Sequence, residues 1–237
     1  YQTLADRLNH AAAAITPGWL GGDLDSSART RKLGGDAVPG RAMHVRVGTA
    51  IAAPGCTFAV PVPFLGAGHI AIDRDARDPR IAAWLRGMLL RVLGALPEGA
   101  VRVLPVDGGT LGAVFAPFRQ LVEAQVWRRP ATDVDALRVV LDEAEEQIAV
   151  AQAGSGREVP YLLIASGALP TGCGSAEHAR LAAIAHAGPA ARVHLLLAGY
   201  PPAGPAGYDS PPRLDHTTYL SEQGELFTVS EPPGPDR

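Results

Sequence analysis

Hydrophobic residues follow two patterns that alternate along most of the chain. Short continuous apolar runs are typical of buried strands, and they occupy residues 69–72, 101–106, 161–165 and 193–198. Longer stretches between these runs place apolar residues on one side of a helix, and they cover residues 80–96, 133–153 and 177–188. Strands that alternate with helices predict an α/β fold, in which a mainly parallel sheet has helices on both faces.

The N-terminal part of the chain lacks this alternation. Residues 4–15 place apolar side chains at helical spacing, and the Gly-rich polar stretch at 21–40 is predicted to be a loop or linker. Two extended runs follow at 43–51 and 56–64, and the prolines of the second suit an edge strand. We therefore expect an N-terminal helix with its linker over residues 1–44.

The C-terminal part ends in a predicted β-hairpin. Residues 201–212 are rich in proline and glycine, which indicates a turn. Residues 216–231 contain two short strand-like runs around Gln223 and Gly224. The main domain, including this hairpin, is expected to cover residues 45–237.

The composition limits the classes of function. Hydrophobic residues make up 47% of the 237 residues and aromatic residues only 5%, so the core must consist mainly of Ala, Val, Leu and Ile. A formal net charge of -3 provides no general attraction to nucleic acid or to anionic membranes. No apolar run approaches the ~20 residues of a membrane span.

Single residue types indicate the cellular context. Cys56 and Cys173 match no metal-ligand spacing, and a reducing cytoplasmic compartment is expected. Lys32 is the only lysine, and the abundance of Ala, Gly and Pro is typical of a GC-rich genome. The chain starts at Tyr1 rather than at Met, so we expect a piece of a larger protein. Membrane association of that larger protein stays open.

The stretch GHIAIDRDARDPR, residues 68–80, joins a predicted strand to a predicted helix through a charged loop. In nucleotide-binding α/β proteins this junction holds a Gly-rich loop that binds phosphate. Here Asp78 followed by Pro79 is a favourable helix start, with an N-cap carboxylate and proline at the first helical position. Asp78 can therefore satisfy the helix N-terminus, while Asp73 and Asp75 would repel a triphosphate.

Four collinear stretches resemble the motor domain of the FtsK/SpoIIIE DNA translocases and of the related type VII secretion ATPases, of an actinobacterial kind. They are GHIAIDRDARDPRIAAWLRGMLL, VRVLPVDGGTLGAVFAPF, PYLLIASGAL and LAAIAHAGPAARVHLLLAGYPP, and they lie within residues 45–202. The resemblance implies a RecA-like fold of the P-loop NTPase type. It also implies ATP and Mg²⁺ as cofactors of active members, and assembly into rings.

The positions that handle phosphate in this family carry other residues here. In register, Arg74 and Pro79 replace the two glycines of the phosphate loop. Arg80 replaces its lysine, and Ile81 replaces its Ser or Thr. A phosphate loop needs glycines so that N–H groups surround the phosphates, a lysine for the β- and γ-phosphates, and a hydroxyl for Mg²⁺. Pro79 has no N–H and Ile81 has no hydroxyl.

The Walker B and sensor positions differ as well. Gly167 replaces the Asp that holds Mg²⁺, and Ala168 replaces the Glu that orients the attacking water. Gly199 and Tyr200 replace a Thr-Gln sensor, and Pro189 replaces an Arg. The resemblance therefore predicts no catalytic residue, no nucleotide-binding residue and no cofactor.

We interpret the chain as a catalytically degenerate, non-enzymatic domain of this family with a structural, docking or regulatory role. The expected partner is another RecA-like domain in the same chain or assembly, or further copies of this chain, and no membrane contact is expected from this segment. One alternative is an ATP-dependent DNA or protein translocase that uses Arg80 in an atypical phosphate loop. A second alternative is a nucleic-acid-binding module, which the net charge of -3 does not favour.

Other polar residues have structural interpretations. Arg74, Arg77 and Arg80 are expected to pair with the Asp residues of their own loop. His69 and His194 stand at predicted strand starts, where a structural hydrogen bond is expected.

Three further features are interpreted as structural rather than catalytic. Asp107 is expected to cap the turn at Gly108 and Gly109. Ser166 lacks the G-x-S-x-G spacing of a nucleophile elbow. The acidic run DEAEEQ at 142–147 is predicted to be a solvated helix face.

Overall fold

The computed structural model describes residues 2–25, 33–34, 41–154, 159–202 and 211–230. Its main element is a six-stranded sheet in the order β4-β5-β6-β3-β7-β8. All neighbouring strands are parallel except β8, which runs antiparallel to β7. The strands are β3 (His69–Ile72), β4 (Val101–Asp107), β5 (Tyr161–Ala168), β6 (Val193–Ala198), β7 (Thr217–Gln223) and β8 (Leu226–Val229).

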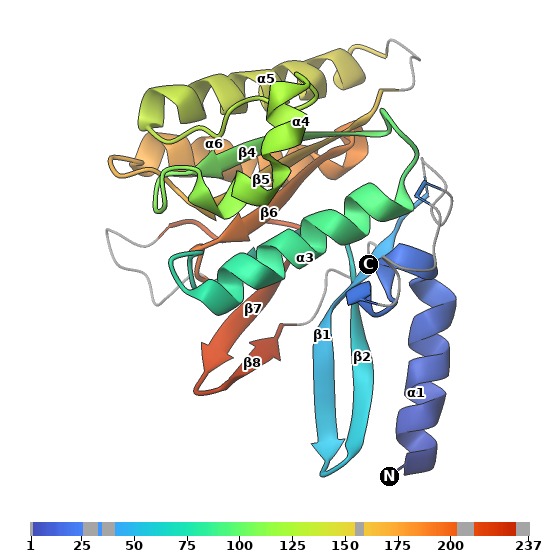
Figure 1. Cartoon of the computed structure of the whole chain (residues 1–237). Coiled ribbons are helices and arrows are strands. Elements are labelled where there is room, and N and C mark those ends of the chain that lie inside the picture. Colours follow the sequence, from blue (N-terminus) through green and yellow to red (C-terminus); the bar gives the residue numbers. More distant parts are fainter. Residues whose placement is uncertain (1, 26–32, 35–40, 155–158, 203–210, 231–237) are drawn as a thin grey trace.

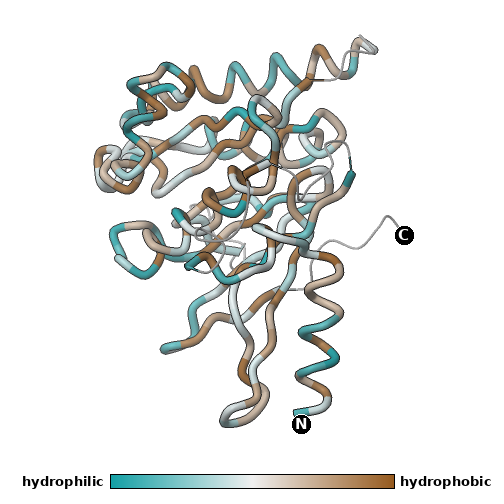
Figure 2. Tube along the Cα trace, turned by 45° about the vertical axis from the view of Figure 1, so that its right-hand side comes forward, coloured by the Kyte–Doolittle hydropathy of each residue, from teal (hydrophilic) through white to brown (hydrophobic). Residues whose placement is uncertain are grey.

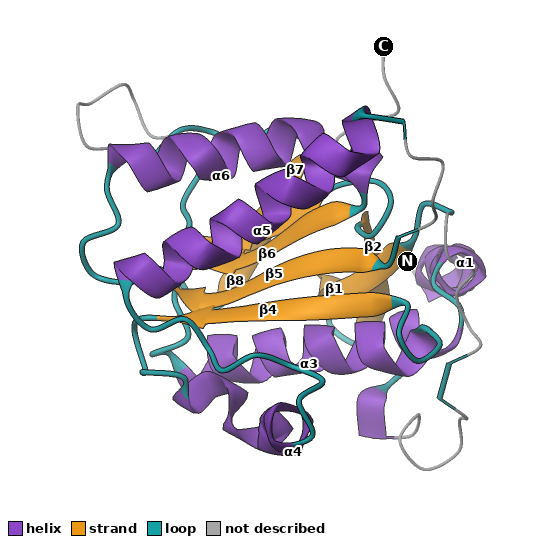
Figure 3. Cartoon of the chain, turned by 90° about the horizontal axis from the view of Figure 1, so that it is seen from above, coloured by secondary structure: helices purple, strands orange, loops and turns teal. Residues whose placement is uncertain are grey.

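Helices cover both faces of this sheet (Figure 3). On one face α3 lies with the short helices η2 and α4, and on the other face lie α5 and α6. The helices are α3 (Pro79–Ala95), η2 (Ala113–Phe118), α4 (Arg119–Glu123), α5 (Val134–Gln152) and α6 (Ser175–Ala187). Two hydrophobic clusters fill the molecule, and β5 and β6 are buried along their whole length. The predicted fold class, a mainly parallel α/β sheet between two helical layers, is confirmed.

A separate two-stranded antiparallel sheet lies beside helix α1 (Figure 1). Its elements are α1 (Gln2–Ile15), β1 (His44–Ala53) and β2 (Cys56–Pro63). The side chain of Asn9 on α1 accepts a hydrogen bond from the N–H of Ala59 and donates one to the C=O of Thr57, both at 2.9 Å. These bonds join α1 to the outer edge of β2, so the prediction that this strand lies at an edge is confirmed.

Helix α1 keeps most of its apolar side chains in solvent. Ala5 and Ala12 are its buried residues, whereas Leu4, Leu8 and Ile15 are exposed. In Figure 2 the helix shows both hydrophobic and hydrophilic colour along its turns. The helical spacing therefore predicts the helix, but the larger apolar side chains are not the ones that pack.

Two buried histidines join β3, β6 and the segments that precede them. His69 donates from Nε2 to the C=O of Ala185 and accepts at Nδ1 from the N–H of Leu195, both at 3.0 Å. His194 accepts at Nε2 from the N–H of Gly66 at 2.9 Å and donates from Nδ1 to the C=O of Gly68 at 2.8 Å. The structural role predicted for both histidines is confirmed.

The C-terminal hairpin is also present, with a small shift. Gln223 pairs with Leu226, so its turn consists of Gly224 and Glu225 rather than Gln223 and Gly224. The short helices η1 (Gly18–Leu20), η2 and α4 were not predicted, because segments of three to six residues carry too few periods for a helical pattern. Most of the predicted linker at 21–40 lies outside the described residues.

Candidate functional site

The loop between β3 and α3 lies at the carboxyl edge of the sheet, where parallel α/β proteins place their ligands. The N–H of Ala76 donates to the C=O of Gly167 at the end of β5, at 2.8 Å. The N–H of Gly199 at the end of β6 donates to the C=O of Arg74, at 2.9 Å. The structure thus brings together the residues that the resemblance places at the phosphate loop, at Walker B and at the sensor.

Backbone N–H groups of this loop donate to oxygens of the protein itself. The N–H of Arg77 donates to Oδ1 of Asp75 at 2.9 Å, and that of Asp78 donates to the C=O of Asp75 at 3.2 Å. The N–H of Arg80 donates to Oδ1 of Asp78 at 2.8 Å, which makes Asp78 the N-cap of α3, with Pro79 as its first residue. The predicted cap is confirmed. These donors are therefore not arranged as an open cradle for an anion.

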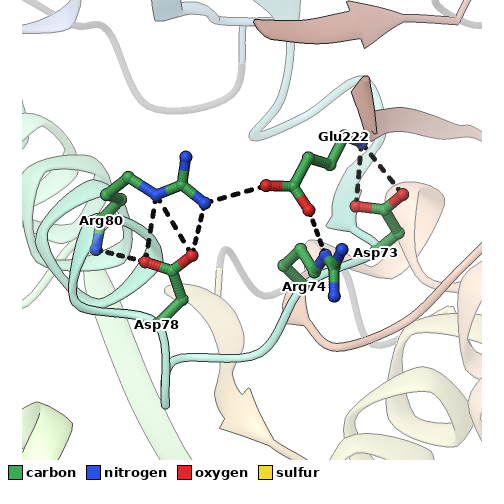
Figure 4. Close-up of polar contacts among 5 residues, drawn as sticks. All are labelled: Asp73, Arg74, Asp78, Arg80 and Glu222. Carbon is green, nitrogen blue, oxygen red and sulfur yellow. Dashed lines mark hydrogen bonds and ion pairs between the residues drawn. The ribbon is translucent and has the colours of Figure 1, made fainter. Parts of the chain in front are cut away.

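An ionic cluster closes the space beside the loop (Figure 4). Nη2 of Arg80 lies 2.7 Å from Oδ2 of Asp78 and 2.8 Å from Oε1 of Glu222. The other oxygen of Glu222 pairs with Nε of Arg74. Asp73 accepts from the N–H of Glu222 with both carboxylate oxygens, at 3.1 and 3.0 Å. The carboxylate of Glu222 therefore lies between two guanidinium groups that come from the β3–α3 loop and the start of α3.

Three acidic residues of this edge are held in their charged form. Hydrogen bonding from Arg80, with a further contribution from Arg74, lowers the pKa of Glu222. Hydrogen bonds from Arg80 also lower the pKa of Asp78, and those from Arg77 lower the pKa of Asp75. Each of these three carboxylates therefore faces an arginine and is ionised at neutral pH.

The arginine pairing differs in part from the prediction. Arg77 pairs with Asp75 and Arg80 with Asp78, as the charge pattern predicts. The prediction for Arg74 was wrong, because its partner is Glu222 on β7. Asp73 forms no ion pair among the described residues and binds a backbone N–H instead. Glu222 was missed because only the strand order places the end of β7 beside this loop.

The two glycines at this edge are required by close packing. A Cβ atom on Gly167 would lie 2.8 Å from Cγ1 of Val114 and 3.3 Å from Cβ of Ala76. Gly199 has a φ of 77°, and a Cβ atom there would lie 2.9 Å from Cβ of Asp75. Helix η2 and the β3–α3 loop therefore fill the space into which longer side chains at positions 167 and 199 would point.

The neighbouring strand ends are closed by similar local contacts. Asp107 is fully buried, and its carboxylate accepts hydrogen bonds from the backbone N–H groups of Thr110 and Gly112 and from the Thr110 hydroxyl. Its predicted role in capping the turn is confirmed. Ala168 is also buried, and the N–H of Gly108 donates to its C=O at 3.0 Å. Ile81 is 1% exposed and belongs to the hydrophobic core.

The predicted acidic face of α5 is only partly solvated. Glu143 pairs with Arg102 at 2.6 Å and with Arg128 at 3.0 Å, and its side chain is only 13% exposed. Arg180 on α6 bonds to Asp142 and Glu145. The prediction of a solvated face was therefore wrong for Glu143, because arginines from other elements pack against it, whereas the Asp142 side chain is 68% exposed, as predicted.

Comparison with known proteins supports the fold. No family model and no curated protein matches this sequence. The chain is similar to the cytoplasmic domain of the Thermomonospora curvata type VII secretion ATPase EccC, with 14% identity and a TM-score of 0.52 over 80% of this chain. It also aligns with T. curvata EccC (ATPases 2 and 3) in complex with a signal sequence peptide, with 13% identity and a TM-score of 0.43 over 70% of this chain.

The first of these comparisons shows the fold, and the matched region is a small part of each EccC chain. The chain spans 24% of the first EccC chain and 30% of the second. The fold is that of RecA-like P-loop ATPase domains, as the first comparison shows. Within the parts of the chain that the structure describes, every helix is too short or too polar to span a membrane.

Proposed function

We propose that this chain is a catalytically degenerate FtsK/SpoIIIE-like ATPase domain with a structural, docking or regulatory role in a translocase or secretion-type assembly. The observation that carries the proposal is the position of Glu222. Its carboxylate lies between Arg74 and Arg80, and Arg80 stands where the phosphate-loop lysine of an active domain would contact a nucleotide. The domain thus supplies its own anion.

The surrounding geometry supports the same conclusion. ATP hydrolysis in P-loop proteins needs N–H groups directed at the phosphates, a hydroxyl and a carboxylate for Mg²⁺, and a residue that orients water. Here the N–H groups of Ala76 and Arg80 donate internally, and the space beyond Gly167 is filled by Val114. Ile81 and Ala168 are buried and have no polar side-chain atom. No nucleotide or metal cofactor is therefore proposed.

The proposed partner is another RecA-like domain of the same chain or assembly. The similar secretion ATPase is about four times longer than the region matched, which leaves room for further domains in a protein of that kind. A domain without its own ATP chemistry can still position or regulate an active neighbour through the surface of its preserved sheet and helices. Further copies of this chain and nucleic acid are the alternative partners.

The test is a measurement of Mg-ATP binding by calorimetry and of ATP turnover by phosphate release. We expect neither saturable binding at millimolar ATP nor turnover above the no-protein rate. Turnover that is lost in Arg80→Ala and retained in Arg77→Ala would contradict the proposal and support the motor with an atypical phosphate loop. Arg77 is the matched control because it pairs only with Asp75 among the described residues.

A further inference from the structure

A cleft of about 470 Å³ separates the two hairpins of the molecule. In Figure 1 the β1–β2 and β7–β8 hairpins lie side by side below α3, with β1 and β8 facing each other. The inner part of the cleft is apolar, and it is lined by Ile72, Ile81, Trp84 and Leu220. Nε1 of Trp84 donates to the C=O of Val47 at 3.0 Å and so joins α3 to β1.

Other sheet edges of the molecule are protected from further pairing. The outer edge of β2 is occupied by Asn9 at Thr57 and Ala59, and Pro61 and Pro63 have no N–H to offer. Natural sheets commonly protect their edges in these ways, since an open edge can pair with another chain.

The outer edge of β4 is covered at its carboxyl end. The N–H of Asp107 donates to the C=O of Ala131 at 2.8 Å, and the N–H of Ala131 donates to the C=O of Pro105 at 2.9 Å. Val103 and Leu104, further along the same strand, are buried. The outer edge of β2 and the carboxyl end of the β4 edge therefore offer few free backbone groups to another chain.

The edge of β8 that faces away from β7 is open. The N–H of Ser230 donates to the C=O of Tyr219, which fixes the residues of this hairpin that exchange hydrogen bonds. By the alternation of an antiparallel pair, Phe227 and Val229 direct their N–H and C=O groups away from β7. Within the described residues no hydrogen-bond partner faces these groups, and both residues line the cleft. Val229 is 39% exposed.

The facing edge of β1 is open in the same way. Because Asn9 binds the outward groups of Thr57 and Ala59, the alternate residues of β2 pair with β1. This register directs the N–H and C=O groups of Thr49 and Ile51 away from β2 and toward the cleft, which both residues line. The cleft thus has backbone donors and acceptors on both walls and an apolar floor.

We propose that an extended peptide segment of a partner protein binds in this cleft by strand addition to the edge of β8. Such a segment presents alternating N–H and C=O groups to Phe227 and Val229, and its alternate side chains pack on the apolar floor. This inference names a partner chemistry for the docking role proposed above. Its evidence is the cleft alone, so the peptide test and the ATP test can fail separately.

The charges of the cleft define the segment further. Arg80 lines the cleft, but Asp78 and Glu222 already neutralise it. Glu225 lies in the exposed turn of the β7–β8 hairpin, and no cation pairs with it among the described residues. Charge complementarity therefore favours a segment that is uncharged along the floor and has a basic residue where it passes this turn.

The test uses two synthetic peptides of about six residues. Both alternate Val and Thr, and they differ only in a Lys or a Glu at the end that meets the turn. Binding is followed by Trp fluorescence, and by hydrogen exchange of the Phe227 and Val229 amides. We expect saturable binding of the Lys peptide with slower exchange at both amides, and at least several-fold weaker binding of the Glu peptide.

Two protein variants make the test specific for strand addition. Val229→Pro removes an outward N–H while leaving the hydrogen-bonded pairs with β7 in place, so we expect at least about tenfold weaker binding. Val229→Thr keeps the N–H and is expected to bind like the wild type. Binding that survives Val229→Pro, or no saturable binding of either peptide, would overturn the proposal. A dimer of the wild type that Val229→Pro dissociates would also overturn it, because the occupant would then be a second copy of this chain.

Discussion

The two ends of β3 are stabilised in opposite ways. At the carboxyl ends, Arg74 and Arg80 hold Glu222 in a cluster whose arginine side chains are 61% and 55% exposed. At the amino ends, His69 and His194 are fully buried and form only neutral hydrogen bonds. Strand β3 thus ends in an ionic cluster that it shares with β7 on one side, and in a buried, uncharged network that it shares with β6 on the other.

The difference determines what each end contributes to stability. Solvent and salt screen the exposed ion pairs at the carboxyl end, so each contributes little. The buried hydrogen bonds at the amino end are not screened, and losing one partner leaves the other polar group buried and unpaired. The end that carries catalytic groups in nucleotide-binding proteins is therefore, in this chain, the less important one for folding.

The largest expected effect is that of pH at the amino ends. Burial lowers the pKa of His69 to about 3 and that of His194 to about 4, and a proton on Nδ1 of His69 would face the N–H of Leu195. Between these values and the usual pKa near 6.5, the unfolded chain binds more protons than the folded one. The two neutral histidines therefore make their whole contribution to the free energy of unfolding above pH 6.5. This contribution falls by roughly 1 kcal/mol per histidine per pH unit as the pH drops toward 4.

Urea unfolding between pH 4.5 and 7.5 measures this slope. At pH 7.5, His69→Ala is expected to lower the free energy of unfolding by about 3 kcal/mol, since it leaves a cavity and two unpaired backbone groups. It should also reduce the slope below pH 6.5. His186→Ala is the control, because His186 is exposed and pairs with Asp215 at the surface. Equal losses in the free energy of unfolding for the two variants would contradict the idea that the buried histidine network contributes more to stability than a surface histidine does.

A smaller effect is expected from the N-cap at the carboxyl edge. Asp78→Ala removes the side-chain acceptor for the N–H of Arg80 and should lower the melting temperature by several degrees at most. Asp78→Ser keeps an acceptor and should restore most of the loss, as thermal unfolding by circular dichroism can measure. A gain in stability from Asp78→Ala would instead reveal that the loop is strained for another purpose.

The smallest expected effect is that of the ionic cluster. Glu222→Ala should lower the melting temperature by only a degree or two, and the difference from wild type should shrink at high salt. With the carboxylate gone, Arg74 and Arg80 have room for another anion, so inorganic phosphate should stabilise the variant more than the wild type. Glu123→Ala, on α4 and remote from the cluster, is the control. If phosphate stabilises the wild type equally, Glu222 does not occupy an anion site.

The elements of this fold could be predicted because each carries its own signal. Buried strands such as Leu162–Ile164 are continuous apolar runs, and Asp78 with Pro79 marks a helix start within two residues. The same holds for Asp107, whose partners lie within five residues of it. Helix caps and turns of this kind can be predicted from the sequence because the interacting residues are close to each other along the chain.

The composition of the candidate site could be predicted only in part. Glu222 lies 148 residues from Arg74, and the two meet because β7 is next to β3 in the sheet. No local pattern encodes that order, so the alternation of strands and helices did not reveal the anion that the arginines hold. The open edge of β8 depends on the same order, together with the register of its hairpin.

The packing around Gly167 has an evolutionary consequence. A carboxylate introduced there would collide with Val114 and lie beside Oδ1 of Asp107, which is 3.3 Å from the Cβ position. Such a substitution would be unfavourable on its own, even if it supplied the group that a metal needs. Gain of a metal-binding carboxylate at this position would therefore require changes in η2 first. Close packing at Gly167 therefore makes the effect of a carboxylate there depend on whether Val114 has changed first.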